Sequence, residues 1–283
     1  MSDQQASGLI AVDVGSTWVK LGWFPTESPC DSPKIAGGLS LTAGPLPQPA
    51  EIFACQHREI SAAEYVGKIG EWLSQFVEYQ PHSAMASVSP VAAKGVAYVF
   101  SKQNLPAPQL LTADDLPITL ELREPPFVGI DRLLSAVAVN RVRSANRAAM
   151  IVDIGTACTV DLVSSQGHFL GGSILPGVGI AASSLQLNTS SLPLVSASDW
   201  ELPEHGLGKH TEAAIASGLY WGILGTVKIL AQQYSAVAGH EPEVFLTGGD
   251  APYFAEGLRE HLGSLRHLPG LILSGIALVM AES

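Results

Sequence analysis

Two copies of one short pattern stand at matching places in the two halves of this chain. Asp13-Val14-Gly15-Ser16-Thr17 follows the apolar run 9–12, and Asp153-Ile154-Gly155-Thr156 follows the apolar run 150–152, about half of the 283 residues later. In each copy a strand leads into Asp-x-Gly-Ser/Thr and a second strand leaves it, which predicts a turn with a carboxylate and exposed backbone N–H groups at its tip. Two such turns facing each other across a cleft can hold a nucleotide's phosphates and cations. The repeat therefore indicates an ATP-using phosphotransferase.

Each residue type in the pattern has a chemical reason. Glycine allows the backbone to approach a ligand closely, and the N–H groups of the turn can then point at phosphate oxygens. The Ser or Thr hydroxyl adds a donor, and the Asp can orient a hydrated divalent ion or bind a monovalent one. An ordinary hairpin turn is the alternative, because Asp and Gly are common turn residues. The second copy favours the functional interpretation.

The apolar periodicity predicts strand hairpins followed by alternating helices and strands, twice over. Strands are expected at 9–12, 18–23, 84–88, 109–112, 150–152, 159–163, 169–174 and 243–246. Helices are expected at 62–79, 90–103, 133–142, 180–187 and 211–234, with two more near the C-terminus. Residues 25–49 are rich in Pro, Gly and Ser, which predicts a loop with at most one weak strand. We expect two related α/β domains with mixed sheets, at 1–125 and 126–283, with the 129–148 helix near the boundary.

Composition narrows the function classes. The hydrophobic fraction is 47% and the charged fraction 14%, as in a globular chain. The net charge is −11 and no basic stripe occurs, so neither nucleic acid nor an anionic membrane surface is an expected partner. The polar start, 1–8, does not resemble a signal peptide, so a cytoplasmic location is expected. The segment 213–231 approaches membrane-spanning length, but its Ser, Thr, Lys and glycines favour a buried helix.

The three cysteines, Cys30, Cys55 and Cys158, are widely spaced. Neither a disulfide framework nor a zinc site is indicated by that count and spacing. Cys158 lies in the second turn, where a small buried thiol is favoured over a reactive one. The histidines show no ligand spacing, so no histidine metal site is expected.

Gly129-Ile130-Asp131-Arg132 places an acid beside a base at a predicted helix start. The positive end of a helix favours anions, and an ionised Asp131 could accept a proton from a substrate hydroxyl. Arg132 offers paired donors for a carboxylate or phosphate. The alternative is an Asp N-cap beside a solvated Arg. Two further motifs stay open: Thr211 as a helix N-cap or a substrate contact, and 247–250 as a strand-to-helix turn or an adenine contact.

Together these motifs resemble the type III pantothenate kinases, members of the superfamily of acetate kinases, sugar kinases, heat-shock chaperone ATPases and actin. The resemblance covers most of the chain, from Ala11 to Ala277. The motifs that carry it are Asp13–Thr17 with Lys20 and Gly22, Gly129–Arg132, Asp153–Asp161, Gly171–Gly177, Leu192-Pro193, Thr211 with Ala214-Ile215 and Gly218, and Thr247–Asp250. It implies two ribonuclease H-like, actin-like ATPase domains, each a mixed five-stranded sheet flanked by helices, with the active site in the interdomain cleft.

The resemblance also implies roles for individual residues. The ATP-binding positions would be Asp13, Val14, Gly15, Ser16, Thr17, Trp18, Val19, Lys20 and Thr156. The pantothenate site would be lined by Gly129, Ile130, Asp131, Arg132 and Thr211. Asp131 would be the general base and Asp153 the ligand of a monovalent cation, K⁺ or NH₄⁺. The implied activity is Mg²⁺- and ATP-dependent phosphorylation of pantothenate to 4′-phosphopantothenate by a homodimer, the first step of coenzyme A biosynthesis.

Two positions depart from the family's usual pattern. Ser16 stands where the first turn usually has Asn, and a hydroxyl can still donate to phosphate. Leu122 stands where the family often has a Tyr that touches the substrate, which bears on affinity more than on chemistry. The competing interpretations are another small-molecule kinase of the superfamily and a non-catalytic regulatory protein on the same scaffold. Intact Asp13, Asp131 and Asp153 favour an enzyme.

Overall fold

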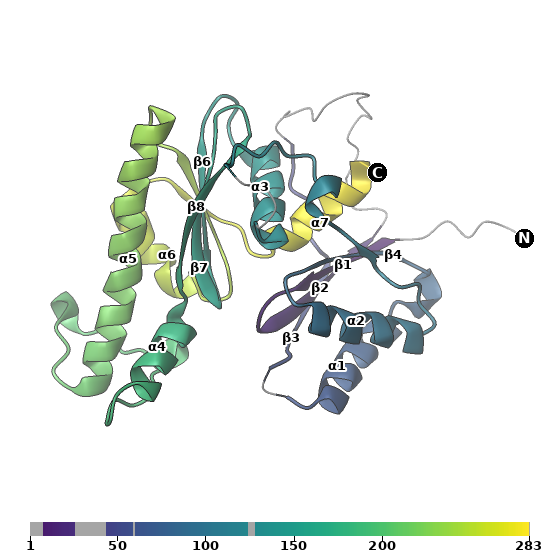
Figure 1. The fold of residues 1–283 in the computed structure, drawn as a ribbon, viewed down its shortest axis with the longest axis horizontal. Coiled ribbons are helices and arrows are strands. Elements are labelled where there is room, and N and C mark those ends of the chain that lie inside the picture. The colour runs from purple at the N-terminus through teal and green to yellow at the C-terminus, as the bar shows by residue number, and fades with distance from the viewer. Residues whose placement is uncertain (1–7, 26–43, 59, 124–127, 283) are drawn as a thin grey trace, which may run out of the picture. The chain divides into compact units, whose positions relative to one another are not determined.

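The computed structural model describes residues 8–25, 44–58, 60–123 and 128–282, and their contacts define two compact units (Figure 1). The first unit holds 1–118, 124–142 and 270–283, and the second holds 119–123 and 143–269. Each unit contains one five-stranded sheet. The chain therefore passes from the first unit to the second and back more than once.

The sheet of the first unit consists of β1 (Gly8–Val14), β2 (Trp18–Pro25), β3 (Glu51–Gln56), β4 (His82–Ser87) and β5 (Gln109–Leu110). Their order is β3-β2-β1-β4-β5. The pairs β1–β2 and β2–β3 are antiparallel, whereas β1–β4 and β4–β5 are parallel. β1 can occupy the centre because successive residues, Ile10, Ala11 and Val12, are apolar and fully buried on both faces.

The sheet of the second unit repeats this arrangement. Its strands are β6 (Ala149–Ile154), β7 (Ala157–Val163), β8 (Phe169–Pro176), β9 (Glu243–Thr247) and β10 (Leu265–His267), in the order β10-β9-β6-β7-β8. Again the first three strands pair antiparallel, and the last two extend the sheet in parallel. Strand for strand, the topology is that of the first sheet. The prediction of two mixed five-stranded sheets flanked by helices is confirmed.

Four long helices belong to the first unit: α1 (Ala62–Ser74), α2 (Pro90–Lys102), α3 (Ile130–Val142) and α7 (Leu271–Glu282). Ser61 caps α1 by accepting the Glu64 N–H at 3.2 Å, and Pro90 starts α2 at a position where its missing N–H costs nothing. α1 and α2 supply buried apolar side chains to the core below the sheet. α7 packs on β1, β2 and β4 and crosses α3.

The second unit carries α4 (Val178–Leu187), α5 (Thr211–Ala238) and α6 (Ala251–Leu262). α5 is long and apolar enough to cross a bilayer by length and composition alone. One face of it packs into the core of the unit through Tyr220, Ile223, Leu224 and Val227, as the expected buried helix would. A single helix of this kind is a common feature of protein cores.

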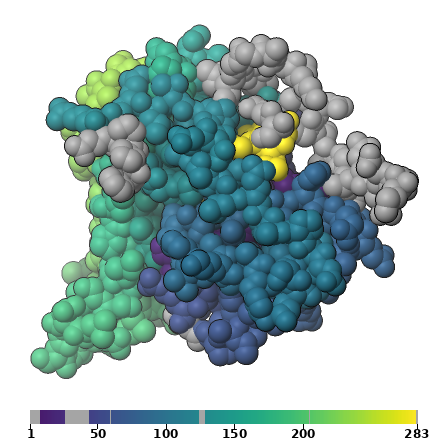
Figure 2. Space-filling model, turned by 45° about the vertical axis from the view of Figure 1, so that its right-hand side comes forward, coloured from purple at the N-terminus to yellow at the C-terminus, as the bar shows by residue number. Residues whose placement is uncertain are grey.

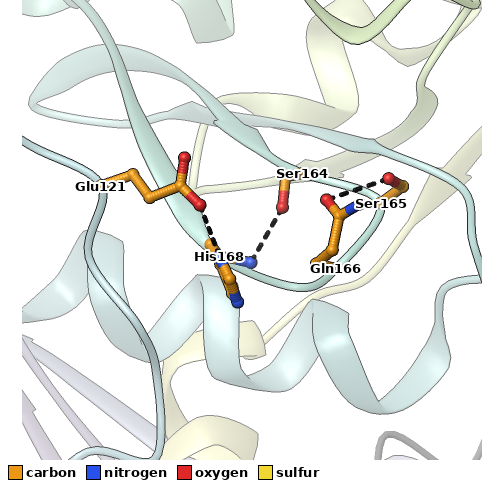
Figure 3. A network of polar contacts seen from close by, with 5 residues as sticks. All are labelled: Glu121, Ser164, Ser165, Gln166 and His168. Carbon is orange, nitrogen blue, oxygen red and sulfur yellow. Dashed lines mark hydrogen bonds and ion pairs between the residues drawn. The ribbon is translucent and has the colours of Figure 1, made fainter.

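Residues 119–123 join the second unit by pairing with β8. The Phe169 N–H donates to the Thr119 carbonyl at 2.8 Å, and the Glu121 N–H donates to the Phe169 carbonyl at 3.0 Å. His168 and Glu121 form a side-chain pair at the same place, beside the turn that Ser164 closes through its contact with the His168 N–H (Figure 3). Leu122 lies beside Gly171, which has a φ of +105°.

Two strands were not predicted from the sequence, and one helix is shorter than predicted. β3 and β10 are edge strands; Glu51 and Ile52 of β3 are exposed, and β10 has only three residues. The predicted helix 62–79 ends at Ser74, and residues 77–79 form a 3₁₀ turn before Gln80 adopts a φ of 45°.

Residues 26–43, within the expected loop, lie outside the described chain. The domain limits 1–125 and 126–283 stay a prediction; the compact units group α3 and α7 with the first sheet.

The crossing of α3 and α7 depends on a glycine. A Cβ at Gly275 would overlap the Leu134 carbonyl group, with its carbon 2.9 Å away. We predict that Gly275→Ala lowers the free energy of unfolding by about 1–3 kcal/mol, because overpacking forces the two helices apart. Urea unfolding followed by circular dichroism measures this. Gly222→Ala on α5 is the matched control: nothing lies within 4 Å of its added Cβ, so equal destabilisation by both changes would contradict the prediction.

Candidate active site

The first acid-bearing turn joins β1 to β2. The Gly15 N–H donates to the Trp18 carbonyl at 2.9 Å, which leaves Ser16 and Thr17 as the two central residues. Ser16 is exposed. Asp13 pairs directly with Lys20 across the two strands, so their side chains lie on the same face of the sheet. Asp13 is 7% exposed. The turn thus combines a carboxylate, an ammonium group and the N–H of Ser16, which has no acceptor within the described chain.

The remaining residues of the predicted ATP loop differ in exposure. Val14 and Val19 are fully buried in the core of the first unit, whereas Trp18 is exposed. The valine side chains therefore support the turn from below, and any contact they make with a nucleotide is through their backbone.

The second turn, between β6 and β7, is one residue tighter than the first. Here the Gly155 N–H donates to the Ala157 carbonyl at 3.0 Å, which leaves only Thr156 between the bonded residues. Two neighbouring backbone segments enclose this turn. The Gly177 N–H donates to the Thr156 carbonyl at 3.2 Å, and the Asp250 N–H donates to the Ile154 carbonyl at 2.9 Å.

Two glycines make this enclosure possible. A Cβ on Gly177 would lie 2.6 Å from the Thr156 carbonyl oxygen. A Cβ on Gly248 would lie 2.6 Å from Asp153 Oδ1, and the φ of Gly248 is +105°, a conformation that other residues rarely adopt. Asp153 is therefore held close to the loop 247–250, which connects β9 to α6. Sequence reasoning found Gly248 within its motif but did not relate Gly177 to the turn.

Cys158 follows the second turn and is fully buried. Burial raises the pKa of its thiol to about 12, and the nearby Asp153 carboxylate adds to the increase. At neutral pH the group is therefore a thiol and not a nucleophilic thiolate. Cys55 is also buried, and burial raises its pKa as well. The interpretation of Cys158 as a small core residue is confirmed; Cys30 lies outside the described residues.

The predicted acceptor motif forms the start of α3. The helix begins at Ile130, so Asp131 lies within the first turn, not at the N-cap position. Asp131 Oδ1 accepts the N–H of Arg132 at 2.9 Å, and the carboxylate is half-buried. A Cβ on Gly129 would overlap Asp131 Oδ1, so a larger residue at this position would make the carboxylate move. The carboxylate is thus fixed at the positive end of a helix, where its charge is favoured.

Thr211 is the first residue of α5 and is exposed. The N-cap is His210, whose Nδ1 accepts the Ala213 N–H at 3.5 Å, so the N-cap alternative for Thr211 is wrong. The hydroxyl of Thr211 is not needed to cap the helix. The loop 247–250 is a strand-to-helix turn, as one of the two alternatives proposed.

The predicted site residues fall in both units. Asp13 to Lys20 and Gly129 to Arg132 belong to the first unit, whereas Asp153, Thr156 and Thr211 belong to the second. No group of three or more His, Cys, Asp or Glu side chains that could hold a metal occurs in the part of the chain that the structure describes. Isolated carboxylates suit Mg²⁺, which usually keeps several waters and is bound by one or two carboxylates together with substrate phosphates.

The repeated mixed sheet, flanked by helices in each unit, is the fold of the actin-like ATPases and sugar kinases. A glucokinase from an Antarctic psychrotroph has this fold: it aligns over 99% of this chain and 100% of its own, with a TM-score of 0.50 and 10% sequence identity. That similarity concerns the fold alone.

Sequence comparison identifies the family. The profile of the type III pantothenate kinases matches residues 9–233. The chain is 30% identical over 252 residues to a type III pantothenate kinase of Dehalococcoides mccartyi strain CBDB1, covering 89% of this chain and 88% of the relative. It is also 30% identical over 201 residues to one of Paramagnetospirillum magneticum, covering 68% and 75%. The chain belongs to the type III pantothenate kinase family.

The enclosure of the second turn gives a prediction. Gly248→Ala adds a methyl group beside Asp153 Oδ1 at a positive φ, so we expect it to displace the turn and to reduce kinase turnover at least about tenfold. A coupled ADP-release assay measures turnover, and the melting temperature reports any loss of stability. Gly249→Ala is the matched control, because its Cβ would meet nothing within 4 Å. Equal activity of the two variants would show that Gly248 does not support the site.

Proposed function

We propose that this protein transfers the γ-phosphate of ATP to the primary hydroxyl of pantothenate, giving 4′-phosphopantothenate and ADP, the first step of coenzyme A biosynthesis. The observation that carries the proposal is the family match over 9–233, which spans the first turn, the α3 motif and the second turn. The presence of a carboxylate at each of these three places supports an active enzyme rather than a regulatory protein. We place the reaction in the cytoplasm.

ATP binding is proposed for both turns. In the first, the Ser16 N–H is outside the ladder of β1 and β2, and Lys20 supplies a positive charge on the face that carries Asp13. Backbone donors in a turn and a nearby ammonium group suit phosphate oxygens. In the second, the Thr156 hydroxyl is proposed to contact the same nucleotide. Such fixed donors stabilise the charge that spreads over the transferred phosphoryl group.

Asp131 is proposed as the general base. Its carboxylate would accept the hydroxyl proton of pantothenate while the hydroxyl oxygen bonds to the γ-phosphorus and the bond to ADP breaks. The orientation of the carboxylate is set by its hydrogen bond with the Arg132 N–H and by the absence of a side chain at Gly129. Gly129, Ile130, Arg132 and Thr211 are proposed to line the pantothenate site.

Mg²⁺ and a monovalent cation, K⁺ or NH₄⁺, complete the proposal. When bound, the divalent ion would supply positive charge that offsets the charge of the ATP phosphates. Asp153 is proposed as the ligand of the monovalent cation, because its half-buried carboxylate lies next to the end of β6 and close to the backbone of the loop 247–250. A single carboxylate together with backbone oxygens suits a weakly bound monovalent ion.

A homodimer is part of the same proposal. Several large apolar side chains are exposed on α4 and the segment that follows it, part of the second unit drawn in green in Figure 2. Leu187 is 80% exposed and Leu207 is 69% exposed, and Leu194 and Ile180 are also exposed. Exposed apolar surface of this kind supports association with another chain.

The experiment that tests the function is ADP release from purified protein with Mg²⁺-ATP and a panel of acceptors. The panel contains pantothenate, sugars, glycerol and acetate. Of these acceptors, we expect only pantothenate to support ADP release. Turnover with another acceptor would identify a different kinase of the superfamily, and no turnover with any acceptor would support a regulatory protein.

We predict that Asp131→Asn lowers turnover by at least about 10²-fold, since the amide cannot accept the hydroxyl proton. ATP binding, measured by calorimetry, is expected to remain. Asp114→Asn serves as the matched control, because Asp114 is an exposed acid in a short turn far from the motif in sequence. Near-normal turnover of Asp131→Asn would remove Asp131 as the base.

The rate is predicted to depend on the monovalent cation. Potassium or ammonium chloride should support turnover, and sodium chloride at the same ionic strength should support much less. In Asp153→Asn this difference between cations should be reduced, because the amide lacks the charge that holds the ion. Equal rates of the wild-type enzyme in all three salts would contradict the assignment of Asp153.

A further inference from the structure

One histidine contacts the first turn at two points. His57 follows the last residue of β3, and its backbone N–H donates to the Thr17 carbonyl at 3.0 Å. Its ring nitrogen Nε2 lies 3.0 Å from the Gly15 carbonyl oxygen. Both carbonyl groups belong to the turn that carries Ser16. The side chain and the backbone of a single residue thus hold the two sides of the turn.

The acceptor fixes the direction of the side-chain bond. A carbonyl oxygen can only accept, so Nε2 of His57 must carry the proton. Both the neutral Nε2–H tautomer and the imidazolium ion satisfy this condition. The contact therefore does not require a particular charge on the ring.

The bond to the Gly15 carbonyl also sets the direction of the next N–H. The peptide bond between Gly15 and Ser16 is trans, as are all those in the described residues, so its C=O and N–H point in opposite directions. When His57 holds the carbonyl on its own side, the Ser16 N–H points away from His57. Within the described chain this N–H has no hydrogen-bond acceptor, and Ser16 is exposed. The donor is therefore available to a ligand.

The ring of His57 is itself supported from behind. It meets the Tyr65 ring edge-on, with centroids 6.3 Å apart. Tyr65 is buried in α1, and its hydroxyl donates to the Ala92 carbonyl in α2 at 3.3 Å. A chain of contacts thus runs from the two helices, through Tyr65 and His57, to the turn.

The second turn does not need such a side chain. The carbonyl of Ile154, just before the turn, and that of Thr156, within it, accept backbone N–H groups from Asp250 and Gly177. These main-chain bonds need no side-chain donor, whereas the bond to the Gly15 carbonyl comes from the side chain of His57.

We propose that His57 is a positioning residue for nucleotide binding, which orients the Ser16 N–H toward the ATP phosphates by holding the Gly15 carbonyl. This inference rests on the proposed role of the first turn. His57 does not touch the substrate; it acts through the peptide group between Gly15 and Ser16. A preoriented donor costs less to organise when the phosphates bind, so loss of the bond reduces nucleotide affinity.

Two substitutions of His57 separate its donor from its bulk. His57→Phe keeps a ring against Tyr65 but has no donor, whereas His57→Gln keeps an N–H near the position of Nε2. We expect His57→Phe to weaken Mg²⁺-ATP binding about tenfold, which corresponds to ~1.4 kcal/mol. His57→Gln should restore binding to within about threefold of the wild type. The Michaelis constant for pantothenate should not change in either variant.

Calorimetric titration of each full-length variant with Mg²⁺-ATP, without an acceptor, measures the affinity for ATP. A steady-state assay measures the Michaelis constant for pantothenate. His82→Phe is the matched control, because His82 is exposed and pairs with Leu9 at the opposite end of β1. Wild-type ATP affinity in His57→Phe would overturn the proposal. An equal loss of ATP affinity in the Phe and Gln variants would also overturn the proposal. So would a rise in the Michaelis constant for pantothenate that accompanies the loss of ATP affinity. Either result indicates a merely structural role.

The outcome is distinguishable from failure of the proposed function. If the wild-type protein binds ATP but phosphorylates another acceptor, the proposed function fails while the difference between the Phe and Gln variants still supports the role of His57. If the wild-type protein phosphorylates pantothenate and the variants bind ATP normally, only the role of His57 fails.

Discussion

The burial of one central strand in each unit determines where an acidic group can be placed. Residues 10–12 of β1 and 150–152 of β6 are buried on both faces, with partner strands on both sides. A carboxylate inside such a strand would lose its hydration at a cost of several kcal/mol. Asp13 and Asp153 each stand one residue before the end of its strand, next to the turn. The turn that follows brings backbone N–H groups next to each carboxylate.

The two turns are then stabilised by different means. The second is enclosed by backbone segments that approach closely because Gly177 and Gly248 lack side chains. The first is held by a histidine that reaches it from the end of an edge strand. In both, the backbone of the turn is held by contacts from other segments of the same unit, and our proposal that the turns bind phosphate relies on such preorganisation.

Much of this architecture could be predicted from the sequence because its signals are local. The buried strands and the two Asp-x-Gly turns combine apolar runs with characteristic turn residues. The edge strand β3 was not predicted although Ile52 to Cys55 are apolar, because this short run directly follows the long segment 25–49 that is rich in Pro, Gly and Ser. Grouping α3 and α7 with the first sheet depends on a close crossing at Gly275, which no local pattern reveals. The contact of His57 with Gly15 joins residues 42 positions apart and has no sequence signature.

The unequal lengths of the two turns have a consequence for how the halves of the chain are compared. Aligning the motifs by their letters matches Ser16 with Thr156, but the strand registers show that Thr17 has no counterpart. One loop exposes two consecutive peptide units at its apex and the other only one. The internal duplication is thus not a residue-for-residue repeat: before the turn Val14 corresponds to Ile154, but after it Val19 corresponds to Cys158, so the spacing between equivalent positions shortens by one residue at the turn.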